Sequence, residues 1–436
     1  MKKETPIDFS VVQEVIDEFN LPCFGKATIR EVVAMTNQIE KRTGKRFIRM
    51  EMGVPGLPAS QIGVQAEIKA LQNGVASIYP PLDGIPEMKE QASRFVKAFI
   101  NVDVPAYCCT PVTGSMQGTM ASFITCSQRD KKKDTVLFID PGFPVQKQQL
   151  IMMKCPFETF DVYNYRGEAL RKELEKYLSK GNITTLIYSN PNNPAWFCLQ
   201  ESELKIIGEL ADKYDVIVLE DLAYFAMDFR KDLGTPFQPP FQATVAHYTD
   251  NYILLVSGSK AFSYAGQRIG YTAISEKLFN RIFPSLEEQY GTGGFGNIFV
   301  NRVLYSLSSG TSHAAQYAMA AMLKAACDGE FHFLNEVKEY GRRAEKVKKY
   351  FLDNGFYIVY DNDLGENLAD GFYFTIAYPG MTGSELMKEF MFYGIAAISL
   401  ETTGSEQEGL RVCTSFIKDN QYEDMKYRLE RFKANH

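Results

Sequence analysis

Side chains that could carry out chemistry follow three short apolar runs of this sequence. Asn190–Pro194 follows the first run and Glu220–Tyr224 the second. Ser257–Lys260 follows the third, and Arg268 stands eight residues further on. A lysine amine can form an imine, a carboxylate can stabilise a neighbouring positive charge, and an arginine near a helix start can bind phosphate. Each segment alone is typical of a turn or a cap, but their occurrence together at successive strand ends indicates one site.

The order of these segments resembles that of the class I/II aminotransferases, which are fold-type I enzymes dependent on pyridoxal phosphate (PLP) and include aspartate-aminotransferase-like proteins. The family pattern Ser-x-Ser-Lys followed by Gly-x-Arg-x-Gly appears at Ser257–Lys260 and Gly266–Gly270. The pattern Asp-x-x-Tyr appears at Asp221 and Tyr224, at the family's interval before the lysine. The resemblance extends from about residue 53 to residue 411.

The resemblance assigns catalysis to Lys260, Asp221 and Tyr224. Lys260 would hold PLP as a Schiff base, so its surroundings must disfavour the extra positive charge of a protonated amine. Asp221 would keep the ring nitrogen protonated, which makes the ring an electron sink. Tyr224 and Asn193 would hydrogen-bond the phenolic oxygen of the ring.

The remaining cofactor contacts implied by the resemblance surround the phosphate and the ring face. Gly114 would allow a tight turn, and Ser115 and Met116 would offer backbone N–H groups at a helix start. Ser257 and Arg268 would donate from their side chains.

Two aromatic residues complete the implied cofactor site. Phe143 would stack on the pyridine face, although an ordinary core phenylalanine after a strand is an equal alternative. Tyr79, in the segment Tyr79–Met88, matches a family tyrosine that reaches the phosphate of the neighbouring subunit's cofactor. A homodimer with sites at the interface follows from that resemblance.

The substrate side of the implied site involves Gly53, Asn193 and Arg411. Arg411 would grip the α-carboxylate of an amino acid in a two-pronged pair, and Gly53 would lie in a loop that contacts the substrate. The sequence departs from the family at Ala195 and Trp196, where Thr-Gly is usual. Because of this departure, the sequence alone does not determine the conformation of the turn or how the substrate reaches the site.

The elements that must position these residues have the pattern of an α/β protein. The apolar runs lack strict alternation, which is typical of buried parallel strands, and amphipathic stretches separate them. We therefore expect a mostly parallel sheet with helices on both faces. The predicted strands are Thr135–Ile139, Thr184–Ser189, Val216–Leu219, Tyr252–Val256 and Tyr271–Ile274, and the helices between them include Gly167–Leu178 and Glu201–Tyr214.

The pattern predicts a second, smaller α+β domain. Its expected elements are helices at Glu14–Phe19, Thr28–Thr43, Ser312–Cys327 and Phe331–Leu352, a strand at Gly371–Ala377 and a helix after Gly383. We place the large PLP-binding domain at residues 51–305, and the small domain at residues 1–50 and 306–436.

Composition excludes several classes of function. The 436 residues carry a formal net charge of −6, which argues against a nucleic-acid binder. The eight cysteines form no Cys-x-x-Cys pair, and the four histidines have no metal-ligand spacing, so we expect reduced thiols and no metal site. The start of the chain lacks an apolar signal segment and no apolar run is long enough to span a bilayer, so we expect a cytoplasmic protein without a membrane segment.

Two other motifs are rejected as sites. Ser257–Lys260 also fits the Ser-x-x-Lys motif of penicillin-binding acyl enzymes, but the accompanying Ser-Asp-Asn and Lys-Thr-Gly are missing from the sequence. Gly291–Gly296 fits Gly-x-Gly-x-x-Gly, but it follows no apolar strand, so we interpret it as a flexible loop.

The resemblance implies a ping-pong transfer of an amino group from an amino acid to a 2-oxo acid, with Lys260 moving the proton of the substrate Cα. A β-lyase or decarboxylase remains an alternative, as does a PLP-sensing regulator, although the 52 residues before Gly53 are too few and not basic enough for a DNA-binding module.

A further expectation concerns the substrate side chain. Relatives that accept aspartate use an arginine of the partner subunit three residues before a tyrosine; counting back from Tyr290 gives Glu287. A glutamate there would make aspartate and glutamate poor donors. The alternative is a shifted loop in which Glu287 is an exposed helix-end charge, and Arg281 or Arg302 could then replace it.

Overall fold

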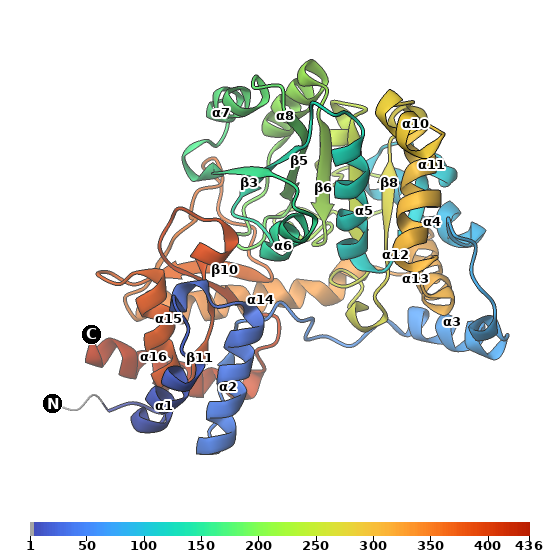
Figure 1. The fold of residues 1–436 in the computed structure, drawn as a ribbon. Coiled ribbons are helices and arrows are strands. Elements are labelled where there is room, and N and C mark those ends of the chain that lie inside the picture. Colours follow the sequence, from blue (N-terminus) through green and yellow to red (C-terminus); the bar gives the residue numbers. More distant parts are fainter. Residues whose placement is uncertain (1–3) are drawn as a thin grey trace.

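A seven-stranded sheet forms the centre of the larger part of the molecule in the computed structural model, which describes residues 4–436 (Figure 1). The strand order is β2-β8-β7-β6-β5-β3-β4. Strand β8 runs antiparallel to both of its neighbours, and the other pairs are parallel, so the predicted mostly parallel sheet is confirmed. The strands are β2 (Cys109–Val112), β3 (Thr135–Asp140), β4 (Phe157–Asp161), β5 (Ile183–Ser189), β6 (Ile217–Leu222), β7 (Tyr252–Ser257) and β8 (Gly270–Ile274).

Both faces of this sheet are covered by helices. Successive residues of a strand point to opposite faces, and in β7 Ile253 and Leu255 belong to one apolar cluster while Leu254 and Val256 belong to another. The first cluster contains side chains of α5, and the second contains side chains of α4 and α8. Burial on both faces explains why the central strands read as continuous apolar runs in the sequence.

The helices of this part follow the predicted alternation of strands and helices. They are α3 (Gln61–Gln72), α4 (Pro86–Ile100), α5 (Gly114–Gln128), α6 (Pro144–Met153), α7 (Ala169–Leu178), α8 (Glu201–Tyr214), α9 (Glu276–Asn280), α10 (Pro284–Tyr290), α11 (Phe295–Ile298) and α12 (Tyr305–Ser308), with a π-helical turn at Phe299–Leu304. Gly291–Gly294 is a short loop between α10 and α11, in which Gly294 forms an isolated β-bridge with Ile282, and it does not follow a strand of the large sheet.

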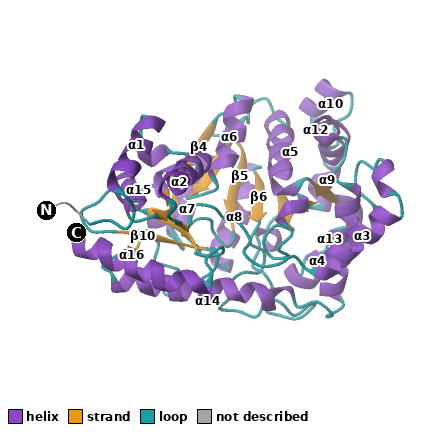
Figure 2. Ribbon diagram, turned by 90° about the horizontal axis from the view of Figure 1, so that it is seen from below, coloured by secondary structure: helices purple, strands orange, loops and turns teal. Residues whose placement is uncertain are grey.

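The smaller part combines both ends of the chain and lies beside the carboxyl ends of the large sheet's parallel strands (Figures 1 and 2). Its antiparallel sheet has the order β12-β13-β10-β9, and a parallel pair joins β1 to β11. These strands are β1 (Ile48–Arg49), β9 (Tyr357–Ile358), β10 (Tyr373–Ala377), β11 (Ile395–Ala396), β12 (Ile398–Ser399) and β13 (Leu410–Cys413). The helices are α1 (Phe9–Phe19), α2 (Ile29–Thr43), α14 (Phe333–Asp353), α15 (Gly383–Phe392) and α16 (Tyr422–Asn435).

Local capping sets the start of α2, which carries part of the site. The Thr28 hydroxyl accepts a hydrogen bond from the Glu31 N–H at 3.2 Å, and the Glu31 carboxylate accepts one from the Thr28 N–H at 2.7 Å. This reciprocal pair satisfies two backbone N–H groups at the start of the helix, which have no carbonyl acceptor within the helix.

Helix α13 (His313–Cys327) packs on α3 and α4, so its apolar residues join the core of the large sheet. Helix α14 contributes Phe333 and Tyr340 to that core and Ala344 and Phe351 to the core of the smaller part. This packing favours a boundary between the larger and the smaller part that lies within α14, later in the chain than residue 305. The division at residues 50 and 305 remains a prediction.

Among residues 4–436, the structure contains no helix long and apolar enough to cross a bilayer. In the same range, no three His, Cys, Asp or Glu side chains gather in a way that could hold a metal ion.

Candidate active site

The carboxyl ends of β3, β5, β6 and β7 open into a cavity of about 1090 Å³ at the boundary between the two parts. The register aligns Ser189 with Asp221 and Asp221 with Leu255, so segments distant in the sequence end at one edge of the sheet. Eleven of the residues predicted from the sequence line this cavity: Gly53, Ser115, Met116, Phe143, Asn193, Asp221, Tyr224, Ser257, Lys260, Arg268 and Arg411.

Lys260 points its amine into the cavity and donates a hydrogen bond to the Gly53 carbonyl oxygen. Loss of solvation lowers the pKa of the Lys260 amine to about 8, and the positive charges of Arg411 and Arg268 act in the same direction. A fraction of the amine is therefore neutral and nucleophilic near neutral pH.

Asp221, in β6, is a buried carboxylate with amide neighbours. Its Oδ1 accepts a hydrogen bond from the Ala223 N–H at 3.1 Å, and its Oδ2 accepts one from the Gln146 side chain at 2.8 Å. Burial raises the pKa of Asp221 to about 6, because these two hydrogen bonds offset only part of the lost solvation. The site would thus favour a group that brings a positive charge to this carboxylate.

Tyr224, Asn193 and Arg411 form a buried chain of polar contacts. The Asn193 amide lies 3.5 Å from the Tyr224 hydroxyl, and Arg411 Nη1 lies 3.4 Å from Asn193 Oδ1. Arg411 also donates from Nη2 to the Glu51 carbonyl at 2.6 Å, while its buried Nε has no hydrogen-bond partner among the described residues. The Arg411 guanidinium therefore brings a fixed positive charge to the cavity wall, which suits an incoming carboxylate.

The start of α5 also lines the cavity. Gly114 has a φ of +68°, and a Cβ at this position would lie 2.7 Å from Arg268 Nη2. Glycine is therefore required both by the backbone conformation and by the close approach of the arginine. The first turn of α5, with Ser115 and Met116, faces the cavity together with Ser257, which is the arrangement expected for binding an anion.

Tyr79 does not reach the cavity of its own chain. Its side chain is 88% exposed, between a short helical turn and α4. The expected contact with a partner's cofactor remains a prediction.

Trp196 lies behind the site and does not line it. The indole is fully buried, with its ring centroid 5.1 Å from that of Tyr224 and 6.0 Å from that of Tyr373. A Cβ at residue 371 would lie 2.2 Å from the indole, so Gly371 makes room for it. Trp196 therefore supports the wall that carries Tyr224.

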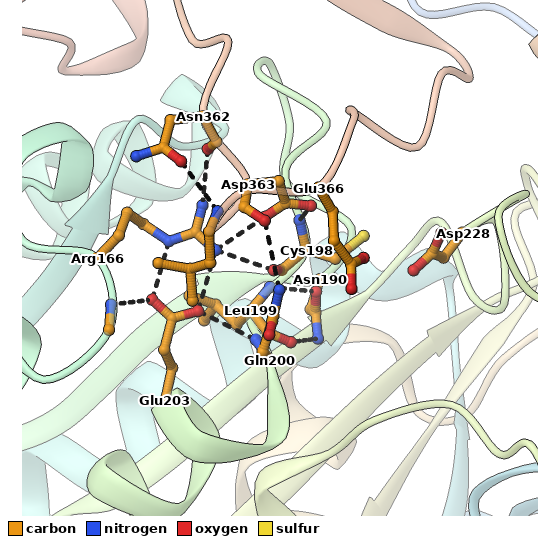
Figure 3. A network of polar contacts seen from close by, with 12 residues as sticks. Arg166, Asn190, Cys198, Leu199, Gln200, Glu203, Asp228, Asn362, Asp363 and Glu366 are labelled. Atoms are coloured by element: carbon orange, nitrogen blue, oxygen red, sulfur yellow. Dashed lines mark hydrogen bonds and ion pairs between the residues drawn. The ribbon is translucent and has the colours of Figure 1, made fainter.

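A network of ion pairs fixes the segment that follows Asn193 (Figure 3). Asp363 is fully buried; its Oδ1 lies 2.9 Å from Arg166 Nη2 and its Oδ2 lies 2.7 Å from Arg230 Nη1. Asp363 Oδ2 also accepts a hydrogen bond from the Cys198 N–H at 3.2 Å. A loop of the smaller part thus holds the turn that carries Asn193.

Glu287 lies outside the cavity lining. It is exposed on α10 and borders a separate hollow of about 410 Å³. The neighbouring Tyr290 hydrogen-bonds Gln128 at the far end of α5, about 20 Å from the helix start by helix rise. The contact expected of Glu287 would be with the site of a partner subunit, so this expectation remains a prediction. Arg281 pairs with Asp215, before the amino end of β6, and also lies outside the cavity lining.

The lining residues that sequence reasoning did not assign include Gln146, Ser259 and Tyr373. Gln146 stands three residues after Phe143, about one helical turn away, and this spacing is a signal that could have identified it. Tyr373 belongs to the smaller part, and no local motif marks it.

Comparison with known proteins agrees with this geometry. The family model for aminotransferase class I and II matches residues 48–423. A probable aspartate aminotransferase of Methanocaldococcus jannaschii is 25% identical over 359 residues, which are 76% of this chain and 88% of that protein. A (5-formylfuran-3-yl)methyl phosphate transaminase of the same organism is 24% identical and covers 94% of this chain and 96% of its own length.

Solved structures show the same fold. The crystal structure of aspartate aminotransferase from Thermotoga maritima has a TM-score of 0.75 at 18% identity and covers 96% of this chain and 98% of that one. The chain belongs to the class I and II aminotransferase family, and it is a PLP-dependent aminotransferase.

Proposed function

We propose that the protein transfers an amino group from an amino acid to a 2-oxo acid by a ping-pong mechanism, with PLP bound covalently to Lys260. The observation that carries this proposal is the placement of the Lys260 amine, the Asp221 carboxylate and the Arg411 guanidinium in one cavity. These three groups match the amine, acid and carboxylate-binding functions that the reaction needs.

The residues of the cavity fit the cofactor. Asp221 receives hydrogen bonds only from amide groups among its described contacts, and a protonated ring nitrogen would supply the missing positive charge. Gly114 leaves room for Arg268 at the helix start, where a phosphate would meet backbone N–H groups. When bound, PLP supplies a ring that withdraws electrons from the substrate Cα.

Each residue then has a task that follows from its chemistry. Arg411, whose guanidinium lines the cavity, binds the α-carboxylate and orients the substrate. The amine of Lys260 would act as general base and then as general acid in moving the proton of the substrate Cα. The depressed pKa of Lys260 keeps this amine available as a base.

We further propose that Tyr79 contributes to the site of a partner subunit in a homodimer. Its exposure in the single chain supports this role, since a large aromatic side chain that is 88% exposed gains from burial at an interface.

A screen of amino donors with product analysis tests the proposal. A transferase releases one equivalent of 2-oxo acid per site without a second substrate, and steady-state turnover then requires an acceptor 2-oxo acid. Continuous release of ammonia or carbon dioxide without an acceptor would instead identify a lyase or a decarboxylase.

A further inference from the structure

Tyr373 places a second tyrosine hydroxyl against Tyr224 inside the cavity. Tyr373 begins β10 in the smaller part, and its hydroxyl oxygen lies 2.8 Å from that of Tyr224. Both side chains are buried and both line the cavity. The two parts of the molecule therefore meet at a hydrogen bond beside Lys260.

The position of Tyr373 is fixed by its surroundings. Its backbone pairs with Cys413 in the antiparallel β10–β13 ladder. The guanidinium carbon of Arg411 lies 4.7 Å from the centre of the Tyr373 ring, within the range of a cation–π contact. A Cβ at residue 53 would lie 1.7 Å from the Tyr373 hydroxyl, so Gly53 makes the space for this oxygen. The hydroxyl thus occupies a defined place rather than the end of a mobile side chain.

The direction of the hydrogen bond follows from counting protons. A tyrosine hydroxyl donates one hydrogen and can accept others. The Asn193 amide already donates toward Tyr224, and Tyr224 can give its single hydrogen either to Tyr373 or to a ligand in the cavity. If Tyr224 donates to the ring oxygen of the cofactor, Tyr373 must be the donor in the tyrosine pair.

We propose that Tyr373 is a positioning residue that donates its hydrogen bond to Tyr224 and so directs the Tyr224 proton to the ring oxygen of the cofactor. This inference rests on the proposed function. Burial raises the pKa of Tyr373 to about 12 and that of Tyr224 well above its ordinary value, so both hydroxyls keep their protons at neutral pH. Two hydrogen bonds in sequence also polarise each other, which makes Tyr224 a stronger donor.

The pH titration of the cofactor's visible absorbance in the holoenzyme measures this effect. A hydrogen bond donated to the ring oxygen stabilises the form of the cofactor in which the imine nitrogen shared with Lys260 is deprotonated. A weaker donor therefore raises the pH midpoint of the absorbance change. Tyr373→Phe should raise the midpoint by about a few tenths of a pH unit. Tyr224→Phe should raise it more, and the double variant should match Tyr224→Phe, because Tyr373 acts through Tyr224.

Kinetics and a control variant separate positioning from a general structural effect. Tyr373→Phe retains the ring over Arg411, so kcat should fall several-fold while KM for the amino donor changes by less than about twofold. The control is Tyr393→Phe, which removes a buried hydroxyl of the smaller part that hydrogen-bonds Asn435 at 2.8 Å and does not line the cavity. This variant should leave the midpoint unchanged.

Three outcomes would overturn the inference: an unchanged midpoint in Tyr373→Phe, a lowered midpoint, which would mean that Tyr373 accepts the bond, or additive shifts in the double variant. A wild-type protein that gains no visible absorbance band when PLP is added would instead reject the proposed function, so the two failures are distinguishable.

Discussion

Replacing Asp221 with asparagine tests the electrostatics of the site in the protein without cofactor. Burial raises the pKa of Asp221 to about 6 from an ordinary value of 3.8. One pKa unit corresponds to about 1.36 kcal/mol, so the charged carboxylate costs the folded apoprotein about 3 kcal/mol. Because the folded pKa lies above the unfolded one, the stability contributed by the protonated carboxyl is present below about pH 4 and is lost as pH rises through about 6.

The asparagine variant should therefore be more stable than the wild type where the carboxylate is charged. We expect Asp221→Asn to raise the free energy of unfolding of the apoprotein by up to about 3 kcal/mol near pH 8 and to change it little near pH 4. In the holoenzyme the same change removes the partner of the ring nitrogen, so we expect kcat/KM to fall about a hundredfold, and such a fall corresponds to about 3 kcal/mol of transition-state stabilisation.

Urea unfolding of the apoprotein at the two pH values measures the first effect. The matched control is Asp215→Asn, because Asp215 pairs with Arg281 and Arg129, which hold the pKa of this carboxyl well below its ordinary value. That variant removes a carboxylate that stabilises the folded state above the ordinary pKa, so it should be less stable than the wild type near pH 8. An Asp221→Asn protein that is destabilised near pH 8, or equally stabilised at both pH values, would refute the reasoning.

Three other substitutions test the supports of the site. Asp363→Asn leaves two arginines without their shared buried carboxylate, so urea unfolding should show a loss of about 3–5 kcal/mol. Gly114→Ala places a Cβ 2.7 Å from Arg268 Nη2 at a φ of +68°, so PLP titration should show weaker binding. Arg411→Lys replaces a two-pronged donor with a point charge, so KM for the amino donor should rise about tenfold or more while cofactor absorbance is retained.

Each of these substitutions has an outcome that contradicts it. A loss below about 1 kcal/mol in Asp363→Asn would mean that the network in Figure 3 is not a cooperative buried unit. Wild-type PLP affinity in Gly114→Ala would mean that the close approach of Arg268 to residue 114 does not matter for cofactor binding. An unchanged KM in Arg411→Lys would assign carboxylate binding to another residue.

The central strands could be predicted from the sequence because both of their faces are buried. Strands β3, β5, β6, β7 and β8 are continuous apolar runs, and the structure confirms them. The two missed strands lie at the edges of the sheet. Strand β2 contains Pro111, which a central strand position rarely accepts, and β4 has only two apolar residues, Phe157 and Phe160, in its five positions.

The residues on the cofactor side of the site could be predicted from the sequence because they lie in short local motifs. The position of Lys260 follows from its neighbours at the end of one strand, and the structure brings it together with Asp221 and Arg411. Tyr373 carries no such signal, since its place beside Tyr224 depends on how the two parts of the molecule meet. The assignment of Glu287 depended on counting from Arg268 to Tyr290 across β8, α9 and α10, where a shift in register changes the residue that is assigned.

Borohydride reduction of the yellow holoenzyme, followed by peptide mapping, tests the central claim most directly. Reduction converts the imine between lysine and cofactor into a stable amine, so the label marks the attachment site. The account predicts a single labelled peptide carrying the cofactor on Lys260, and no labelled peptide from a Lys260→Ala protein. A cofactor fixed to any other lysine of the wild-type protein would contradict it.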